Sequence, residues 1–215
     1  MKSSKLFAVA VATMLVAVAS RAAHVDMNDP RRALGREDDV RIDAQLIQDT
    51  VTSGSSVGVT YQVNNLTKQP IAVADKVCDV SYDSETRTIT IAIGSEVPKD
   101  GEMPHLVTIP PGEKKTMTAG AILHVASPTV RSPFVATPQY VEIKVSVLRD
   151  VAPFVDLIQR QSNAVRPVEL TDQQFDQWLD SNDTIFLNAI PVRYEAKSKN
   201  GLADASQRGN GAGSF

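Results

Sequence analysis

The stretch Val57-Gly58-Val59-Thr60-Tyr61-Gln62-Val63-Asn64 decides the fold class. Its apolar and polar residues alternate without interruption, so that Val57, Val59, Tyr61 and Val63 lie on one face. An alternation of period two is typical of a strand with one buried face. We therefore expect a strand here that is central in its sheet, or nearly so.

The same alternation recurs on both sides of this stretch, in short runs separated by turn-forming residues. The runs 78–82 and 88–93 flank the hydrophilic loop 83–86, which is short enough for a β-hairpin. The clean alternation of 140–148 is typical of a strand in an antiparallel sheet. Further strands are expected over 40–46, 71–73, 106–109, 116–125 and 184–194, the last of them bent at Pro191.

Two short helices are expected before the last strand. Apolar residues recur at helical spacing over 151–158. The second helix begins near Thr171, which forms a capping-box pattern with Gln174. Its apolar face is predicted to comprise Phe175, Trp178 and Leu179.

These elements predict a mainly β fold, an immunoglobulin-like antiparallel β-sandwich with two short helices inserted before the last strand. An open barrel is the alternative. Two strand ends, Val63-Asn64-Asn65 and Ile109-Pro110-Pro111-Gly112-Glu113, resemble in a degenerate form the strand ends of many bacterial immunoglobulin-like domains. No more specific family is indicated.

The first 22 residues have the three-part pattern of a secretory signal peptide. Lys2 and Lys5 precede an uncharged apolar run over 6–19, and small residues surround Ala22. The apolar run is shorter than the roughly 20 residues that a bilayer-spanning helix needs. We expect cleavage after Ala22 and a periplasmic or secreted protein without a membrane span, with an uncleaved membrane anchor as the alternative.

The rest of the chain divides into three parts. Residues 23–39 are polar and charged without periodicity and are predicted to be a flexible leader. Residues 40–195 are expected to form the β-sandwich domain. Residues 196–215 are rich in Gly, Ser, Asn and Ala and are predicted to be a disordered tail.

Composition excludes several classes of protein and partner. The 215 residues are 42% hydrophobic and 22% charged, which is unlike collagen, a coiled coil or a disulfide scaffold. The net charge of −3 gives no basic footprint, so nucleic acid is not an expected partner. Cys78 is the single cysteine, and its alternation with Val80 and Tyr82 predicts a buried side chain.

No pattern in the sequence indicates catalysis. The three histidines, His24, His105 and His124, lie outside every known catalytic or metal-binding motif, and no phosphate-binding glycine loop is present. We therefore predict that the protein is not an enzyme, with no catalytic, metal or cofactor-binding residues and no cofactor. Asn65 and Asn182 begin glycosylation sequons, which matter only in a eukaryotic secretory pathway.

The leading hypothesis is an exported, non-enzymatic module that binds a protein or a cell-envelope component. The proline-interrupted segment 126–139 is a candidate contact loop, with Arg131 and Phe134 as its anchors. This segment equally fits a plain crossing between two sheets. A secreted proteinase inhibitor and a hydrolase with a site not visible in the sequence are the alternative functions.

Replacing Arg131 and Phe134 together by Ala tests the contact loop. We expect weaker binding of an identified partner and an unchanged Tm, because anchors on a loop contribute to an interface and not to the core. Titration calorimetry and thermal unfolding measure the two quantities. An unchanged affinity would remove the loop from the contact surface.

Overall fold

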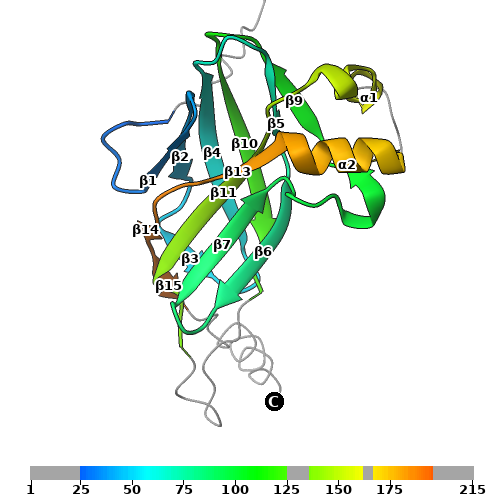
Figure 1. The fold of residues 1–215 in the computed structure, drawn as a ribbon. Helices are drawn as coiled ribbons and strands as arrows, with labels where there is room; N and C mark the ends of the chain where they lie inside the picture. Colours follow the sequence, from blue (N-terminus) through cyan, green and yellow to red (C-terminus); the bar gives the residue numbers. More distant parts are fainter. Residues whose placement is uncertain (1–24, 125–135, 162–166, 196–215) are drawn as a thin grey trace, which may run out of the picture.

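A computed structural model describes residues 25–124, 136–161 and 167–195 (Figure 1). These residues are mainly in strands, as predicted, with two short α-helices. The predicted signal peptide, the tail 196–215 and the proposed anchors Arg131 and Phe134 lie outside the described residues.

The first sheet contains four antiparallel strands in the order β1-β2-β4-β10. The strand predicted from 57–64 is β4, and it lies inside this sheet between β2 and β10. Its alternating apolar side chains are buried as expected. The bounds are Arg32–Glu37 for β1, Val40–Leu46 for β2, Ser56–Asn65 for β4 and Lys114–Ile122 for β10.

The second sheet has the order β6-β7-β11-β5-β9, and β13 and β14 also pair with β11. The predicted hairpin is confirmed as β6 and β7. However, β11 runs parallel to β7, so the expected all-antiparallel arrangement was wrong. Alternation of apolar and polar residues indicates that one face of a strand is buried. It does not indicate whether the adjacent strand runs parallel or antiparallel. The bounds are Ile71–Ala74 for β5, Val77–Asp83 for β6, Thr88–Ile93 for β7, Leu106–Ile109 for β9, Tyr140–Leu148 for β11, Asn182–Phe186 for β13 and Ile190–Pro191 for β14.

Short elements join and cover the sheets. β3 pairs with β15 and β8 pairs with β12, each as a small separate sheet. The two α-helices precede β13, as predicted. The bounds are Thr50–Thr52 for β3, Lys99–Gly101 for the 3-10 turn η1, Glu102–Met103 for β8, Ala152–Phe154 for the 3-10 turn η2, Val155–Gln161 for α1, Val168–Glu169 for β12, Asp172–Ser181 for α2 and Arg193–Glu195 for β15.

The start of α2 follows the predicted capping box. The Gln174 N–H donates to the Thr171 hydroxyl over 3.3 Å, and the Thr171 N–H donates to the Gln174 side chain over 3.1 Å. Trp178 is buried edge-on against Phe154. Leu179 is 45% exposed, so its predicted place on the buried face was wrong. Successive side chains on a helix point about 100° apart. Trp178 points toward Phe154, and Leu179 therefore points away from that contact.

The predicted leader, residues 23–39, contains strand β1, so its description as flexible was wrong for residues 32–37. Several of the charges that suggested a solvated segment are paired, among them Asp29 with Arg31. Arg32 forms an ion pair with Asp43 of β2, which is only 5% exposed and also binds Arg41 at 2.8 Å. Burial alone raises the pKa of Asp43, but the hydrogen bonds from Arg41 and Arg32 outweigh it and hold that pKa below its usual value.

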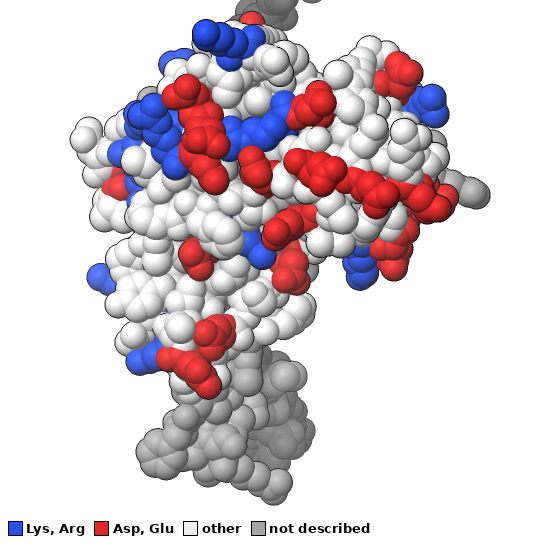
Figure 2. Space-filling view, in the orientation of Figure 1, with Lys and Arg blue, Asp and Glu red and all other residues white. Residues whose placement is uncertain are grey.

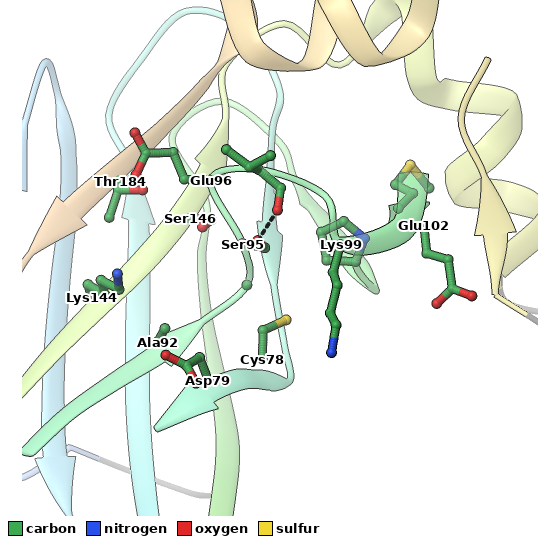
Figure 3. Close-up of a pocket in the computed structure, with 14 residues that line it drawn as sticks. Cys78, Asp79, Ala92, Ser95, Glu96, Lys99, Glu102, Lys144, Ser146 and Thr184 are labelled. Atoms are coloured by element: carbon green, nitrogen blue, oxygen red, sulfur yellow. Dashed lines mark hydrogen bonds between the residues drawn. The ribbon is translucent and has the colours of Figure 1, made fainter. Parts of the chain in front are cut away.

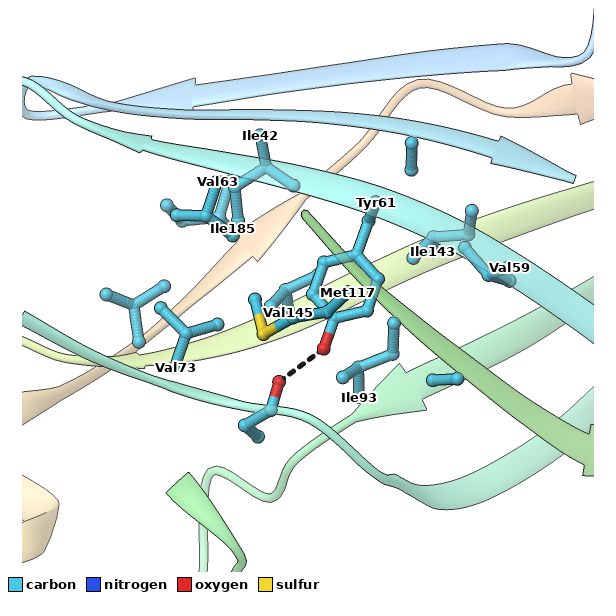
Figure 4. Close-up of a cluster of buried hydrophobic side chains, with 14 of the residues drawn as sticks. Ile42, Val59, Tyr61, Val63, Val73, Ile93, Met117, Ile143, Val145 and Ile185 are labelled. Atoms are coloured by element: carbon cyan, nitrogen blue, oxygen red, sulfur yellow. Dashed lines mark hydrogen bonds between the residues drawn. The ribbon is translucent and has the colours of Figure 1, made fainter. Parts of the chain in front are cut away.

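The two main sheets pack against each other across one apolar core (Figure 4). Tyr61 of β4 reaches across this core, and its hydroxyl donates to the Ala74 carbonyl of β5 over 2.6 Å. Burial, followed by the nearby Asp75 carboxylate, raises the pKa of Tyr61 far above its usual range. The hydroxyl therefore stays protonated and remains a donor.

Two of the crossings between the sheets, from β4 to β5 and from β9 to β10, meet at Asn65, the last residue of β4. The chain passes to the second sheet after Asn65 and returns to the first after Ile109. The Asn65 amide nitrogen donates to the carbonyls of Gln69 and Ile109, at 2.9 and 3.0 Å. Its backbone carbonyl accepts from Gly112 at 2.8 Å, and its N–H donates to Glu113 at 2.9 Å. The two strand ends singled out in the sequence therefore bind each other.

The two sequons hold structural asparagines. Asn65 has no exposed surface, and Asn182 is 8% exposed with its amide directed at the carbonyls of Ser95 and Glu96, both 3.5 Å away. Glycan attachment needs a free amide nitrogen at the surface. Neither amide meets that requirement in the folded chain.

Replacing Asn65 by Ala is expected to lower the free energy of unfolding by at least about 2 kcal/mol, because each buried polar group left without a partner costs about 1–3 kcal/mol. Urea denaturation measures the loss. Asn64→Ala is the matched control, since Asn64 is half-buried on the same strand. Equal effects of the two substitutions would contradict the role given to Asn65.

Candidate functional site

A cleft of about 490 Å³ opens on the outer face of the second sheet (Figure 3). Its floor is formed by β7, β11 and β13, and its walls by the start of β6 and the segment 94–104. The residues that line it are Cys78, Asp79, Ala92, Gly94, Ser95, Glu96, Val97, Lys99, Glu102, Met103, Pro104, Lys144, Ser146 and Thr184. Pockets of this size are typical of ligand-binding sites.

Gly94 shapes the cleft at the end of β7. Its φ is +80°, and a Cβ atom there would lie 2.5 Å from the Ala74 Cβ and 2.9 Å from the Ser146 Cβ. Only glycine allows this close approach in this backbone conformation. Strand β7 can therefore stop pairing with β11 after Ile93. Beyond that point β5 is the next strand that pairs with β11.

The floor of the cleft contains two hydroxyl groups without hydrogen-bond partners among the described residues. Ser146 is 3% exposed, and its hydroxyl makes no hydrogen bond to that part of the chain. Thr184 lies opposite Ser146 in the register of β11 and β13, and its buried hydroxyl also lacks a partner there. Buried hydroxyls are normally satisfied. The floor therefore has hydrogen-bonding capacity that the described chain does not use.

The charged side chains of the cleft are likewise unpaired. Lys99, Lys144, Asp79, Glu96 and Glu102 line it, and none belongs to any of the six ion pairs between described residues. Charges of both signs are thus available to a ligand that carries both.

Acidic side chains extend beyond the cleft over α2. Asp172, Asp176 and Asp180 are exposed and recur every fourth residue, so they lie along one side of this helix. Figure 2 shows this acidic band crossing the position of α2. The surface beside the cleft is therefore negatively charged.

Cys78 is exposed in this cleft, so the prediction of a buried thiol was wrong. The register of β6 and β7 shifts between Val77 and Asp79, and this irregularity takes Cys78 out of the alternation. Loss of water among the cleft walls raises the pKa of the Cys78 thiol, although the Gly94 N–H lowers it in part. A protonated thiol is a poor nucleophile.

One histidine pair was missed by sequence reasoning. His105 Nδ1 lies 2.7 Å from the Asp75 carboxylate, and the Asp75 N–H donates to the His105 carbonyl over 3.3 Å. The two residues are 30 positions apart, at adjoining ends of β5 and β9, and no local pattern links them. Neither Cys78 nor a hydroxyl of the cleft is hydrogen-bonded to His105. The pair therefore fastens two strand ends.

Comparison with known proteins gives no match: no protein-family model, curated protein or solved structure matches the chain. Within the described ranges, no helix is long and apolar enough to cross a membrane. The same residues hold no group of three or more His, Cys, Asp or Glu side chains placed to bind a metal ion.

Alkylation of Cys78 tests the geometry of the cleft. We expect the native protein to react with iodoacetamide, because the thiol is exposed. The rate should rise with pH along a curve whose midpoint lies above that of the unfolded chain, because the thiolate reacts and the folded pKa is raised. Mass spectrometry measures both curves. A midpoint below that of the unfolded chain would contradict the desolvated environment.

Proposed function

We propose that this chain is an exported, non-enzymatic module with an immunoglobulin-like β-sandwich, and that it binds a protein or cell-envelope component in this cleft. The observation that carries the proposal is the pair of unpartnered hydroxyls on the cleft floor, Ser146 and Thr184, of which the Thr184 hydroxyl is fully buried. A folded chain that leaves such groups unpaired gains free energy when a ligand supplies the missing hydrogen bonds.

The lining of the cleft favours a polar segment of another protein over an apolar small molecule. Among the described residues no aromatic side chain lines the cleft, and its apolar lining residues include Val97, Met103 and Pro104. Apolar ligands bind in pockets lined mainly by hydrophobic and aromatic groups. A peptide segment carries amide groups for the hydroxyls and side chains of both signs for the charges.

Electrostatics supports a preferred orientation of that segment. The acidic band on α2 attracts basic side chains, and Lys99 and Lys144 offer positions for acidic ones. Complementary charge across an interface fixes register and increases the rate of encounter. We therefore expect a partner segment in which acidic residues contact the cleft and basic residues lie beside α2.

Site-specific photocrosslinking in the cells that make the protein tests the proposal. A photoreactive amino acid replaces Lys99 in the cleft wall, and in a second variant it replaces Lys68, an exposed residue that does not line the cleft. A defined protein adduct at position 99 and none at 68 is expected. Adducts at neither position, or equally at both, would contradict the proposed site.

Charge reversal at the same positions gives a quantitative prediction. Lys99→Glu is expected to weaken binding of the crosslinked partner by about fivefold or more, mainly through slower association, because a rim charge acts on the encounter rate. Lys68→Glu changes the net charge equally and should leave the affinity unchanged. Surface plasmon resonance at two salt concentrations measures both rates. Equal weakening by both variants would indicate a non-specific charge effect and contradict the site.

A further inference from the structure

Within the described residues, one edge of strand β10 pairs with no other strand. The Asn65 N–H donates to the Glu113 carbonyl and the Leu123 N–H to the Ser55 carbonyl, so in the register of β4 and β10 the odd-numbered residues of β10 direct their backbone polar groups at β4. The even-numbered residues therefore direct theirs away from the sheet. These residues are Lys114, Thr116, Thr118, Gly120 and Ile122, and β10 pairs with no second strand in the described chain.

Three other sheet edges, those of β1, β9 and β6, are protected. On β1, the Leu34 N–H donates to the Asn188 side chain over 2.6 Å, and the Asn188 N–H donates back to the Leu34 carbonyl over 3.2 Å. On β9, the Leu106 N–H donates to the Gln161 side chain over 3.1 Å. β6 is interrupted at Cys78 by its irregular register. Covering groups and bulges are the usual means of blocking strand addition.

β10 lacks these protections. Its nine residues pair with β4 in an unbroken register and contain no proline. β6 of the facing sheet passes close to β10 but does not pair with it. Ile122, at the end of the strand, is 59% exposed. A long, regular edge with an exposed apolar side chain is a template for another strand.

We infer that the edge of β10 is an interaction surface, and that it binds β10 of a second copy of this chain in antiparallel orientation about Thr118. In this register Lys114 lies opposite Ile122 of the second copy, and Thr116 lies opposite Gly120. No two like charges are opposed, and the methylene stem of Lys114 covers Ile122. In this register the even-numbered residues of one copy lie opposite the even-numbered residues of the other. Their outward N–H and C=O groups therefore form hydrogen-bonded pairs.

The two-fold symmetry of this pairing limits the assembly to two copies. An isologous contact uses the same surface on both chains, and the contact therefore closes after one addition. The first sheet becomes continuous across the dimer, while the proposed ligand-binding cleft lies on the second sheet. This inference does not depend on the proposed ligand of the cleft.

Charge complementation at position 118 tests the pairing. In the proposed register Thr118 of one copy lies opposite Thr118 of the other. Thr118→Lys alone, or Thr118→Glu alone, therefore places two like charges opposite each other. A mixture of the two variants places a lysine opposite a glutamate. Analytical ultracentrifugation of the full chain purified from its own host, over a range of concentrations, measures the dimer. We expect a dimer for the unchanged chain, at least tenfold weaker dimerisation of each variant alone, and recovery in the mixture.

Thr60→Lys is the matched control, because Thr60 lies beside Thr118 on β4, one strand in from the edge. It should leave dimerisation unchanged. Melting temperatures establish that all variants are folded, and Thr118→Pro, which removes an outward N–H, provides a second way to block pairing. A monomeric unchanged chain at every concentration, or a dimer insensitive to all three Thr118 substitutions, would overturn the inference. Crosslinking at Lys99 reports separately on the cleft.

Discussion

The buried amide of Asn65 is the interaction on which the rest of the structure depends. Burial of apolar faces brings two sheets together but leaves their relative register weakly specified, because the hydrophobic effect has no direction. A buried amide accepts only a few geometries, since each of its groups needs a partner. Here that amide holds the chain where it leaves the first sheet after β4 and where it returns before β10, at Gln69 and Ile109.

The cleft follows from this arrangement. The crossing after Asn65 leads into β5, which pairs with the end of β11 beyond the point where β7 stops. Gly94 permits that exchange of neighbours, and the segment after it forms the wall of the cleft above Ser146. A site carried on strands of one packed core is held rigidly, which lowers the entropic cost of binding.

Much of the fold was predictable because it depends on local pattern. Alternation identified β4 and the β6–β7 hairpin, and Thr171 with Gln174 marked the start of α2. The failures concern relations between distant residues. Arg32 seemed solvated because its partner Asp43 lies on another strand, and the parallel pairing of β7 with β11 leaves no trace in either sequence.

The site was not predictable for the same reason. Its lining comes from residues 78 to 184, on five strands and the segment between β7 and β8, and none of them forms a motif with its sequence neighbours. Native-state hydrogen exchange tests the central claim about Asn65 most directly. The Thr67 N–H donates to the side-chain oxygen of Asn65 over 3.0 Å. The amide protons of Asn65, Thr67 and Gly112 should exchange only through global unfolding, with the same free energy as the protected amides of β4. Exchange of these three through a local opening of lower free energy would contradict the account.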